Sequence, residues 1–282
     1  LTKKISKEEY KAKMPQMEIE LGRLQRECRE LKIPVMIVFE GFGASGKGVQ
    51  IGKLIQSMDP RGFQVFPVKA ETEEERMHPF LWRFWTKTPE AGRIAIFDGS
   101  WYRKVLIDRF EKRTREKEIE TAFHSIEAFE KQLTDGGTIL VKLLLDIDQK
   151  EQKKRFEKLL EKKETAWRVS QGDRERNAKY SEYAAMMEEV LYRSDTKSAP
   201  WTVIEATDRR FATVKIYMTV IHALAEAVEA VQRRRMEEQA IKAAEQVSGQ
   251  QEAAEIMRQA GGELEMLQSS VLSKADLTLA YG

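Results

Sequence analysis

Residues 34–48 read PVMIVFEGFGASGKG and join an apolar run to a glycine-rich loop that contains a lysine near its end. The apolar run from Val35 to Phe39 is typical of a parallel strand that is buried on both faces. A strand followed by Gly-x-x-x-x-Gly-Lys and then a helix indicates a phosphate-binding loop, in which backbone N–H groups and the helix N-terminus face the anion. The stretch therefore predicts an α/β fold with a phosphate site at the end of this strand.

The candidate phosphate contacts come from the backbone of this loop and from one lysine. They are Gly41, Gly43, Ala44, Ser45, Gly46, Lys47 and Gly48. Lys47 would reach the outer phosphates and is also a catalytic candidate. Gly48 stands where a Ser or Thr usually holds Mg²⁺, so a metal ion would need another ligand. The alternative is a tight strand-to-helix turn in which the glycines only serve packing.

Asp98 closes another apolar strand, residues 93–97, and is followed by Gly99 and Ser100. A carboxylate at such a strand end is typical of a Walker B element, which holds Mg²⁺. Ligands of parallel sheets collect at the carboxyl ends of the strands, so Asp98 and the loop at 41–48 are expected to face one crevice. Asp98 is therefore the candidate metal ligand and the second catalytic candidate. A role as a helix N-cap or in an Asx-turn is the alternative.

Apolar runs and helical patterns alternate through the rest of the chain. Further strands are expected at 63–68, 138–145 and 201–204, with helices at 6–31, 46–57, 100–134 and from 148 to about 163. Pro15 is expected to kink or divide the first helix, and Thr72 to cap a single helix that ends before Pro89. The alternation predicts a doubly wound parallel sheet with helices on both faces.

The last part of the chain differs in composition. A long helix rich in Ala, Glu, Gln and Arg is expected from residue 209 to about 259. The globular domain is placed at residues 1–230, and residues 231–282 are expected to form a helical arm and a linker.

Residues 155–185 are dense in Arg, Lys and Glu. In an enzyme that transfers phosphate, such a segment is expected to form a lid that closes over the phosphate and excludes water. The alternative is a pair of solvent-exposed helices with charge pairs on their surface, which would have the same sequence pattern. The candidate cations of the lid and its surroundings are Arg103, Arg155, Arg168, Arg174 and Arg176.

The composition argues against several classes of protein. With 41% hydrophobic and 33% charged residues the chain reads as a soluble globular protein, and no uninterrupted apolar run approaches the roughly 20 residues that span a bilayer. A net charge of +2 creates no field that would favour nucleic acid. The single Cys28 excludes an internal disulfide and favours a cytoplasmic location. The histidines His78, His124 and His222 lack the spacing of a zinc site.

Seven segments of the chain resemble, in consistent order, the type-two polyphosphate kinase family. They are EGFGASGKG, DPRGF, ETEEE, HPFLWRFW, PEAG, IFDGSWY and TKSAPWTVIEATDRR. The resemblance implies a thymidylate kinase-like fold with a phosphate loop and a helical lid, Mg²⁺ as cofactor, and assembly into homo-oligomers. It also implies a kinase that moves phosphoryl groups between inorganic polyphosphate and a nucleotide, with conversion of AMP to ADP as the expected reaction.

The chain departs from the family pattern at several charged positions. Gly43 stands where the family loop has an aspartate, and Gly99 stands where an arginine follows the Walker B aspartate. Glu175, Asn177 and Thr213 also stand at basic positions of the family. The acidic residues that could replace the lost carboxylate are Glu40, Glu71, Glu73 and Asp108.

These losses favour a second hypothesis, because phosphoryl transfer between polyanions depends on metal ions and cations. In this hypothesis the domain alone is weakly active or inactive and binds phosphate or acts as a scaffold. Residues 269–282 resemble the lead-in to another domain of the family. The chain would then be the first half of a tandem enzyme.

Overall fold

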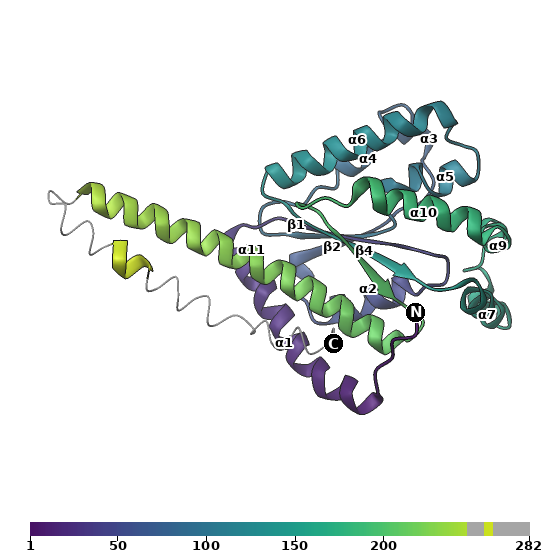
Figure 1. The fold of residues 1–282 in the computed structure, drawn as a ribbon, viewed down its shortest axis with the longest axis horizontal. Coiled ribbons are helices and arrows are strands. Elements are labelled where there is room, and N and C mark those ends of the chain that lie inside the picture. Colours follow the sequence, from purple (N-terminus) through teal and green to yellow (C-terminus); the bar gives the residue numbers. More distant parts are fainter. Residues whose placement is uncertain (247–256, 262–282) are drawn as a thin grey trace.

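The structure is a computed structural model, which describes residues 1–246 and 257–261. Five parallel strands form one sheet in the order β2-β3-β1-β4-β5 (Figure 1). The strands are β1 (Val35–Gly41), β2 (Phe63–Pro67), β3 (Ile94–Asp98), β4 (Ile139–Asp146) and β5 (Trp201–Glu205). This confirms the predicted doubly wound parallel sheet, with the strand that precedes the glycine-rich loop at its centre.

Helices cover both faces of the sheet. They are α1 (Lys7–Leu31), α2 (Lys47–Gln56), α3 (Glu73–Arg76), α4 (Trp82–Trp85), α5 (Ile107–Phe110), α6 (Glu116–Asp135), α7 (Gln149–Leu160), α8 (Lys163–Ala166), α9 (Gln171–Ala178), α10 (Tyr180–Ser194) and α11 (Arg209–Gln246), with the 3-10 turns η1 (Pro60–Gly62) and η2 (Trp101–Lys104). In Figure 1, α6 and α10 lie above the sheet, whereas α1, α2 and α11 lie below it. Helices α7 and α9 lie at the end of the sheet toward which β4 points, and this is the end that carries the glycine-rich loop.

A buried ion pair lies between β4 and α6. The Lys142 ammonium donates to the Glu130 carboxylate at 2.7 Å, to the Tyr102 hydroxyl at 3.1 Å and to the Ser194 carbonyl at 2.7 Å. Glu130 also accepts from the Trp101 indole at 2.9 Å. A buried charge is tolerated only when its partners are satisfied in this way. Lys142 interrupts the apolar run of β4, but its partner Glu130 lies on α6, so the pattern of the strand alone does not predict the pair.

The expected division of the first helix at Pro15 and the expected single helix after Thr72 are both wrong. Pro15 does not divide the first helix, which runs unbroken from Lys7 to Leu31. Pro15 lies on the exposed side, and the buried side chains of Leu21, Leu24 and Cys28 hold the helix against the body. The helix expected after Thr72 is instead split into α3 and α4. The Thr72–Glu75 capping box is present, but Pro79 lies between the two helices, where it disfavours helical geometry at the residue before it.

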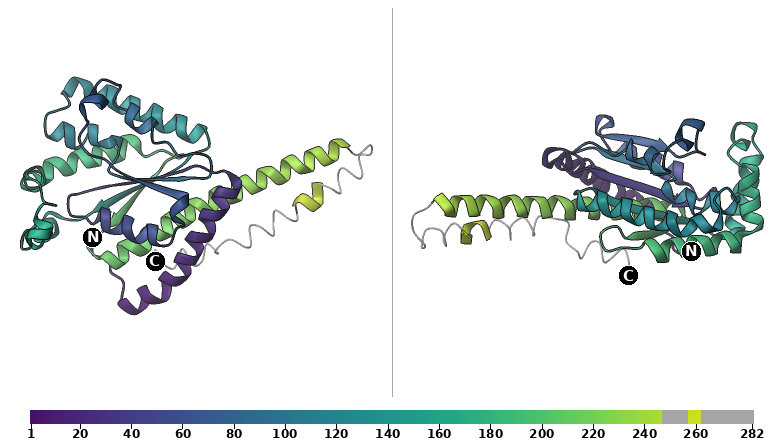
Figure 2. Two further views of the ribbon diagram at one scale, coloured as in Figure 1. Left: turned by 180° about the vertical axis from the view of Figure 1, so that it is seen from behind. Right: turned by 90° about the horizontal axis from the view of Figure 1, so that it is seen from above.

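Helix α11 packs on the sheet and on α1 with its first half and extends beyond the body with its second half (Figures 1 and 2). By length and composition it could cross a membrane, but 67% of its apolar window is buried inside the protein, as in a core helix. Helix α11 is described as far as Gln246, and residues 257–261 are also helical. Residues 247–256 of the predicted helix, and residues 262–282 of the predicted arm and linker, lie outside the described residues.

Candidate phosphate-binding site

The glycine-rich loop adopts a conformation that requires glycine at two points. Gly41 has φ 140°, and a Cβ there would lie 2.2 Å from the Leu145 carbonyl oxygen on β4. Gly46 has φ 106°, open space around it, and forms the N-cap of α2 without a side-chain cap. The first-turn N–H groups of α2 have no partner inside the helix and are therefore available to an anion. Gly41 thus serves packing, whereas Gly46 serves the turn that begins the helix.

Lys47 lies in the first turn of α2 and reaches back over the start of the loop. Its ammonium donates to the Gly41 carbonyl at 2.8 Å and to the Phe42 carbonyl at 3.3 Å. These partners are neutral carbonyl oxygens, which a phosphate oxygen would outcompete as an acceptor because charge-assisted hydrogen bonds are stronger. The side chain is therefore held beside the loop and can turn to an anion without breaking an ion pair.

Asp98 and Glu40 lie at the same edge of the sheet as the loop. Asp98 ends β3 and pairs in register with Phe39 of β1, and its Oδ2 lies 4.0 Å from the position of a Cβ on Gly48. Glu40 is buried and accepts a hydrogen bond from the Ser100 hydroxyl at 2.7 Å. Burial raises the pKa of Glu40, while this hydrogen bond and the charge of Lys47 oppose the rise. The carboxyl ends of β1 and β3 therefore bring Asp98 and Glu40 to the first turn of α2.

This edge of the sheet offers only a few side chains that are suited to hold Mg²⁺. Among residues 1–246 and 257–261, no group of three or more His, Cys, Asp or Glu side chains is placed to hold a metal ion. Mg²⁺ commonly takes only one or two carboxylates and completes its shell with water and substrate phosphates. Asp98 and Glu40 fit that description. Asp108 is engaged elsewhere, with Arg103 at 3.3 Å and Arg113 at 2.6 Å, and Glu73 is exposed.

Gly43 is covered by the segment expected to form the lid. A Cβ at this position would lie 2.9 Å from Oδ1 of Asp173, 3.1 Å from Cζ of Phe156 and 3.4 Å from Nε2 of Gln152. The space that a side chain at position 43 would need is thus filled by α7 and α9. Asp173 brings a carboxylate to this point, and hydrogen bonds from Ser170 and Arg176 hold its pKa below the usual value although burial acts to raise it.

Aromatic packing also joins the loop to the lid segment. The Phe42 ring stacks on Tyr180 with the centroids 4.8 Å apart and meets Tyr183 edge-on at 5.9 Å. The Tyr180 hydroxyl in turn donates to the Ile147 carbonyl at 2.7 Å. Helices α7, α9 and α10 therefore rest directly on the loop in this structure.

Residues 4–234 match the family model Polyphosphate kinase 2 (PPK2). The chain belongs to the polyphosphate kinase 2 family. It is 36% identical over 223 residues to a polyphosphate:AMP phosphotransferase of Pseudomonas syringae pv. tomato, covering 79% of this chain and 45% of the relative. It is 31% identical to an NDP-polyphosphate phosphotransferase of Ruegeria pomeroyi, covering 77% of this chain and 72% of that protein.

A solved polyphosphate kinase 2 structure from Pseudomonas aeruginosa has the same fold. The two structures superpose with a TM-score of 0.77 at 35% sequence identity. The matched region covers 80% of this chain and 48% of the Pseudomonas aeruginosa chain. The present chain therefore spans about half the length of the Pseudomonas proteins that it matches.

The candidate cations of this polyphosphate kinase 2 chain fall into two groups. Arg155 and Arg176 are buried next to the loop, and Arg176 bridges Asp173 at 2.8 Å and Glu111 at 2.6 Å. Arg168 and Arg174 are exposed, and the Arg168 guanidinium lies 5.4 Å from the Trp167 ring centroid. Arg103 pairs with Asp108, so its charge is already partly compensated.

Sequence reasoning missed Gln152 as a residue of the site. Its side-chain amide donates to the Gly43 carbonyl at 3.0 Å. Gln152 and Arg155 are three residues apart on α7, so they share one face of the helix. That spacing, one turn after the Asp148 cap, was the only signal available in the sequence.

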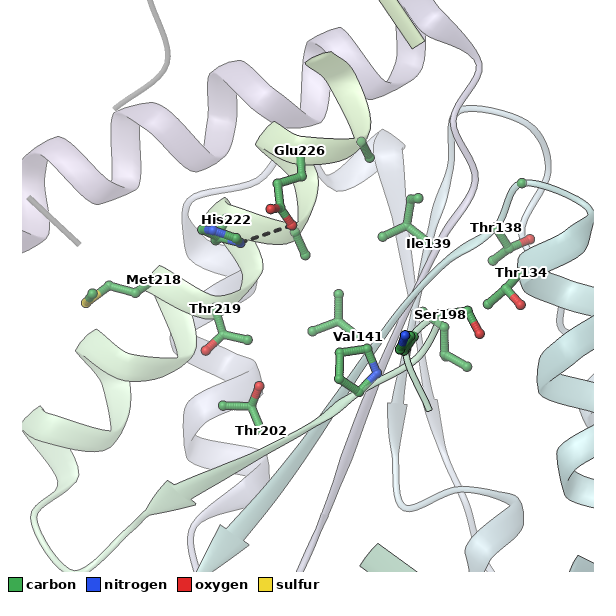
Figure 3. Close-up of a pocket in the computed structure, with 16 residues that line it drawn as sticks. Thr134, Thr138, Ile139, Val141, Ser198, Thr202, Met218, Thr219, His222 and Glu226 are labelled. Atoms are coloured by element: carbon green, nitrogen blue, oxygen red, sulfur yellow. Dashed lines mark ion pairs between the residues drawn. The ribbon is translucent and has the colours of Figure 1, made fainter. Parts of the chain in front are cut away.

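A pocket of about 860 Å³ lies at the opposite edge of the sheet (Figure 3). It is formed by the start of β4, the segment before β5 and the middle of α11, where His222 and Glu226 are 3.2 Å apart. No element of the glycine-rich loop reaches it. The phosphate site is therefore assigned by its backbone geometry and its charges, not by the size of a cavity.

Proposed function

We propose that this protein transfers phosphoryl groups between inorganic polyphosphate and a nucleotide, with AMP converted to ADP. The observation that carries the proposal is the loop at 41–48 with Lys47 above it and Asp98 beside it, in a chain of the polyphosphate kinase 2 family. The name of the Pseudomonas syringae relative supports AMP as the acceptor. Because the chain covers only 45% of that relative, the reaction is assigned here as a proposal.

The residues of the chain would divide the work between binding and charge compensation. The loop amides and the N-terminus of α2 would bind terminal phosphates of the polyphosphate, and Lys47 would leave the Gly41 carbonyl to contact them. Asp98 and Glu40 would hold Mg²⁺, which when bound supplies positive charge at the phosphate oxygens. Such positioning is what phosphoryl transfer demands of a protein, since little covalent chemistry is asked of it.

The lid segment would complete the site. Arg168 and Arg174 are exposed and would meet a polyanion that approaches from solvent, whereas Arg176 links Asp173 to Glu111. We also expect the protein to act in the cytoplasm as a homo-oligomer, with no membrane or nucleic acid partner.

A catalytically degenerate domain remains the contrasting hypothesis, because Gly43 and Gly99 replace charged residues of the family. The comparisons with known proteins give it no support. The test is ADP formation from AMP, polyphosphate and Mg²⁺, measured beside calorimetric titration with tripolyphosphate. Turnover of about one per second or faster supports the proposed function. Binding of tripolyphosphate without turnover would refute it in favour of the degenerate domain.

A further inference from the structure

Side chains of helix α7 donate hydrogen bonds to the backbone carbonyl oxygens of the glycine-rich loop. Gln152 donates to the Gly43 carbonyl at 3.0 Å. Arg155 donates to the Ala44 carbonyl at 3.1 Å and to the Ser45 carbonyl at 3.0 Å. Three consecutive carbonyl groups of the loop are therefore bound by two side chains of one helix. We call Gln152 and Arg155 the carbonyl clamp.

Arg155 has no donor left for a phosphate. Its Nη1 serves the Ala44 and Ser45 carbonyls, and its Nη2 serves the Ala206 and Thr207 carbonyls at 2.8 and 3.0 Å. Its Nε donates to Glu151 at 2.7 Å. An arginine has five N–H donors, and here all five have acceptors. With 7% of its surface exposed, Arg155 is a structural cation behind the loop and not a lid residue that contacts substrate.

The clamp controls which way the loop amides point. In a planar trans peptide, the C=O of one residue and the N–H of the next point in opposite directions. Holding the carbonyls of residues 43, 44 and 45 toward α7 turns the N–H groups of residues 44, 45 and 46 away from it. The Ser45 N–H is used within the loop, by the Phe42 carbonyl at 3.2 Å. The amides of Ala44 and Gly46 are thus directed to the side of the loop opposite α7.

A second helix fixes the clamp itself. The Asn177 side-chain amide on α9 donates to Oε1 of Gln152 at 2.8 Å, which leaves the Gln152 NH₂ group facing Gly43. The Asn177 carbonyl accepts from the Gln149 side chain at 2.7 Å. The Asn177 side chain thus contacts another side chain of the protein. It acts through Gln152.

We propose that Gln152 and Arg155 are positioning residues that set the affinity of the loop for phosphate without touching it. The proposal rests on the proposed function, because it assumes that the loop binds polyphosphate. A purely structural role would make the same contacts but would predict changes in folding stability alone. The two possibilities are separated by ligand affinity measured on folded variants.

The test is calorimetric titration of the full chain with tripolyphosphate. Gln152→Glu keeps the shape of the side chain but places a carboxylate oxygen against the Gly43 carbonyl, and Arg155→Met removes the donors to residues 44 and 45. We expect each variant to bind tripolyphosphate at least about tenfold more weakly, or about 1.4 kcal/mol. Arg155→Lys should bind within about threefold of Arg155→Met, because one ammonium cannot serve four carbonyls in fixed directions.

The matched control is Arg193→Met. Like Arg155, Arg193 is an arginine with several partners: it bridges the carboxylates of Glu120 and Glu189 and covers the Phe123 ring at 4.0 Å. It lies on α10 beside α6, away from the loop. Its loss should leave the affinity for tripolyphosphate within about twofold of the wild type while lowering the melting temperature. An equal loss of affinity in this control would show that general destabilisation is responsible and would overturn the proposal.

The outcomes for the clamp and for the proposed function can be told apart. If the wild type binds tripolyphosphate and the folded Gln152→Glu and Arg155→Met variants bind it equally well, the positioning role is wrong. If the wild type itself does not bind, the proposed function fails, and the clamp proposal fails with it. Should Arg155→Met not fold, Asn177→Ala removes the bond that orients Gln152, together with a 3.2 Å bond to the Gln149 carbonyl, and leaves both clamp residues in place. It is expected to lower the affinity about threefold, and unchanged affinity would count against the proposal.

Discussion

Replacing Gly43 by alanine tests whether the lid segment occupies the space beside the loop. The new Cβ would meet Asp173 Oδ1 at 2.9 Å and the Phe156 ring at 3.1 Å. Overpacking of this kind costs about 1–3 kcal/mol. Gly43 does not have a positive φ, so alanine would also restrict the unfolded chain and return about 0.4–1 kcal/mol. Taken at their midpoints, about 2 kcal/mol lost and about 0.7 kcal/mol regained, the two effects predict a net loss of about 1.3 kcal/mol.

The assay is thermal and urea unfolding of Gly43→Ala beside Gly52→Ala. Gly52 lies inside α2 with nothing within 4 Å of its hypothetical Cβ, so alanine there should stabilise the protein by about 1 kcal/mol. For a chain of this size, about 1 kcal/mol shifts the melting temperature by roughly 2–4 °C. We therefore expect the two variants to move in opposite directions.

A double-mutant cycle assigns the clash to its partner. Asp173→Ala removes the nearest atom, so Gly43→Ala should be better tolerated in that background, with a coupling energy of at least about 0.5 kcal/mol. If Gly43→Ala is as stable as the wild type, or more stable, the closed arrangement of α7 and α9 over the loop is refuted.

Three further predictions concern the loop and its carboxylates. Gly41→Ala should destabilise the fold by about 3 kcal/mol or more, because its Cβ would lie 2.2 Å from the Leu145 carbonyl oxygen and its φ is 140°; a melting temperature like that of the wild type would disprove this. The pKa of Glu40 is raised in the folded state, so between pH 4.5 and that pKa the folded state binds more protons than the unfolded state, and the wild type loses stability as the pH rises. Glu40→Gln should make this loss smaller, measured as melting temperature against pH. A pH profile unchanged by Glu40→Gln would contradict that assignment. Removing divalent cations with EDTA should abolish ADP formation but leave the melting temperature of the ligand-free protein unchanged, because metal binding is assigned to two carboxylates and to substrate phosphates; full turnover in EDTA would exclude the metal's role.

The sheet could be predicted from sequence because its strands are buried on both faces. The run at 138–145 appears as Ile139–Asp146, and the run at 201–204 as Trp201–Glu205. Continuous apolar runs bounded by turns leave little choice of period or position. The shared edge of Asp98 and the loop followed from the same parallel topology.

The contacts of the site could not be predicted, because they depend on how distant helices pack on the loop. Arg155 looked like a surface cation in a charged helix, yet it is buried under four carbonyl groups from two other loops. Gly43 looked like a lost functional group, yet α7 and α9 fill the space beside it. The sequence tells us that such residues are charged or small, but their neighbours are known only from the packing of the folded chain.

The most direct measurement of the central claim is ADP formation from AMP and polyphosphate by the wild type and by Lys47→Met. Lys47 bonds only to two carbonyl oxygens of its own loop, so its loss should change the melting temperature by a few degrees at most. We predict wild-type turnover of about one per second or faster and a fall of at least about 100-fold in Lys47→Met. Turnover that survives the loss of Lys47 would contradict the assignment of the phosphate site to this loop.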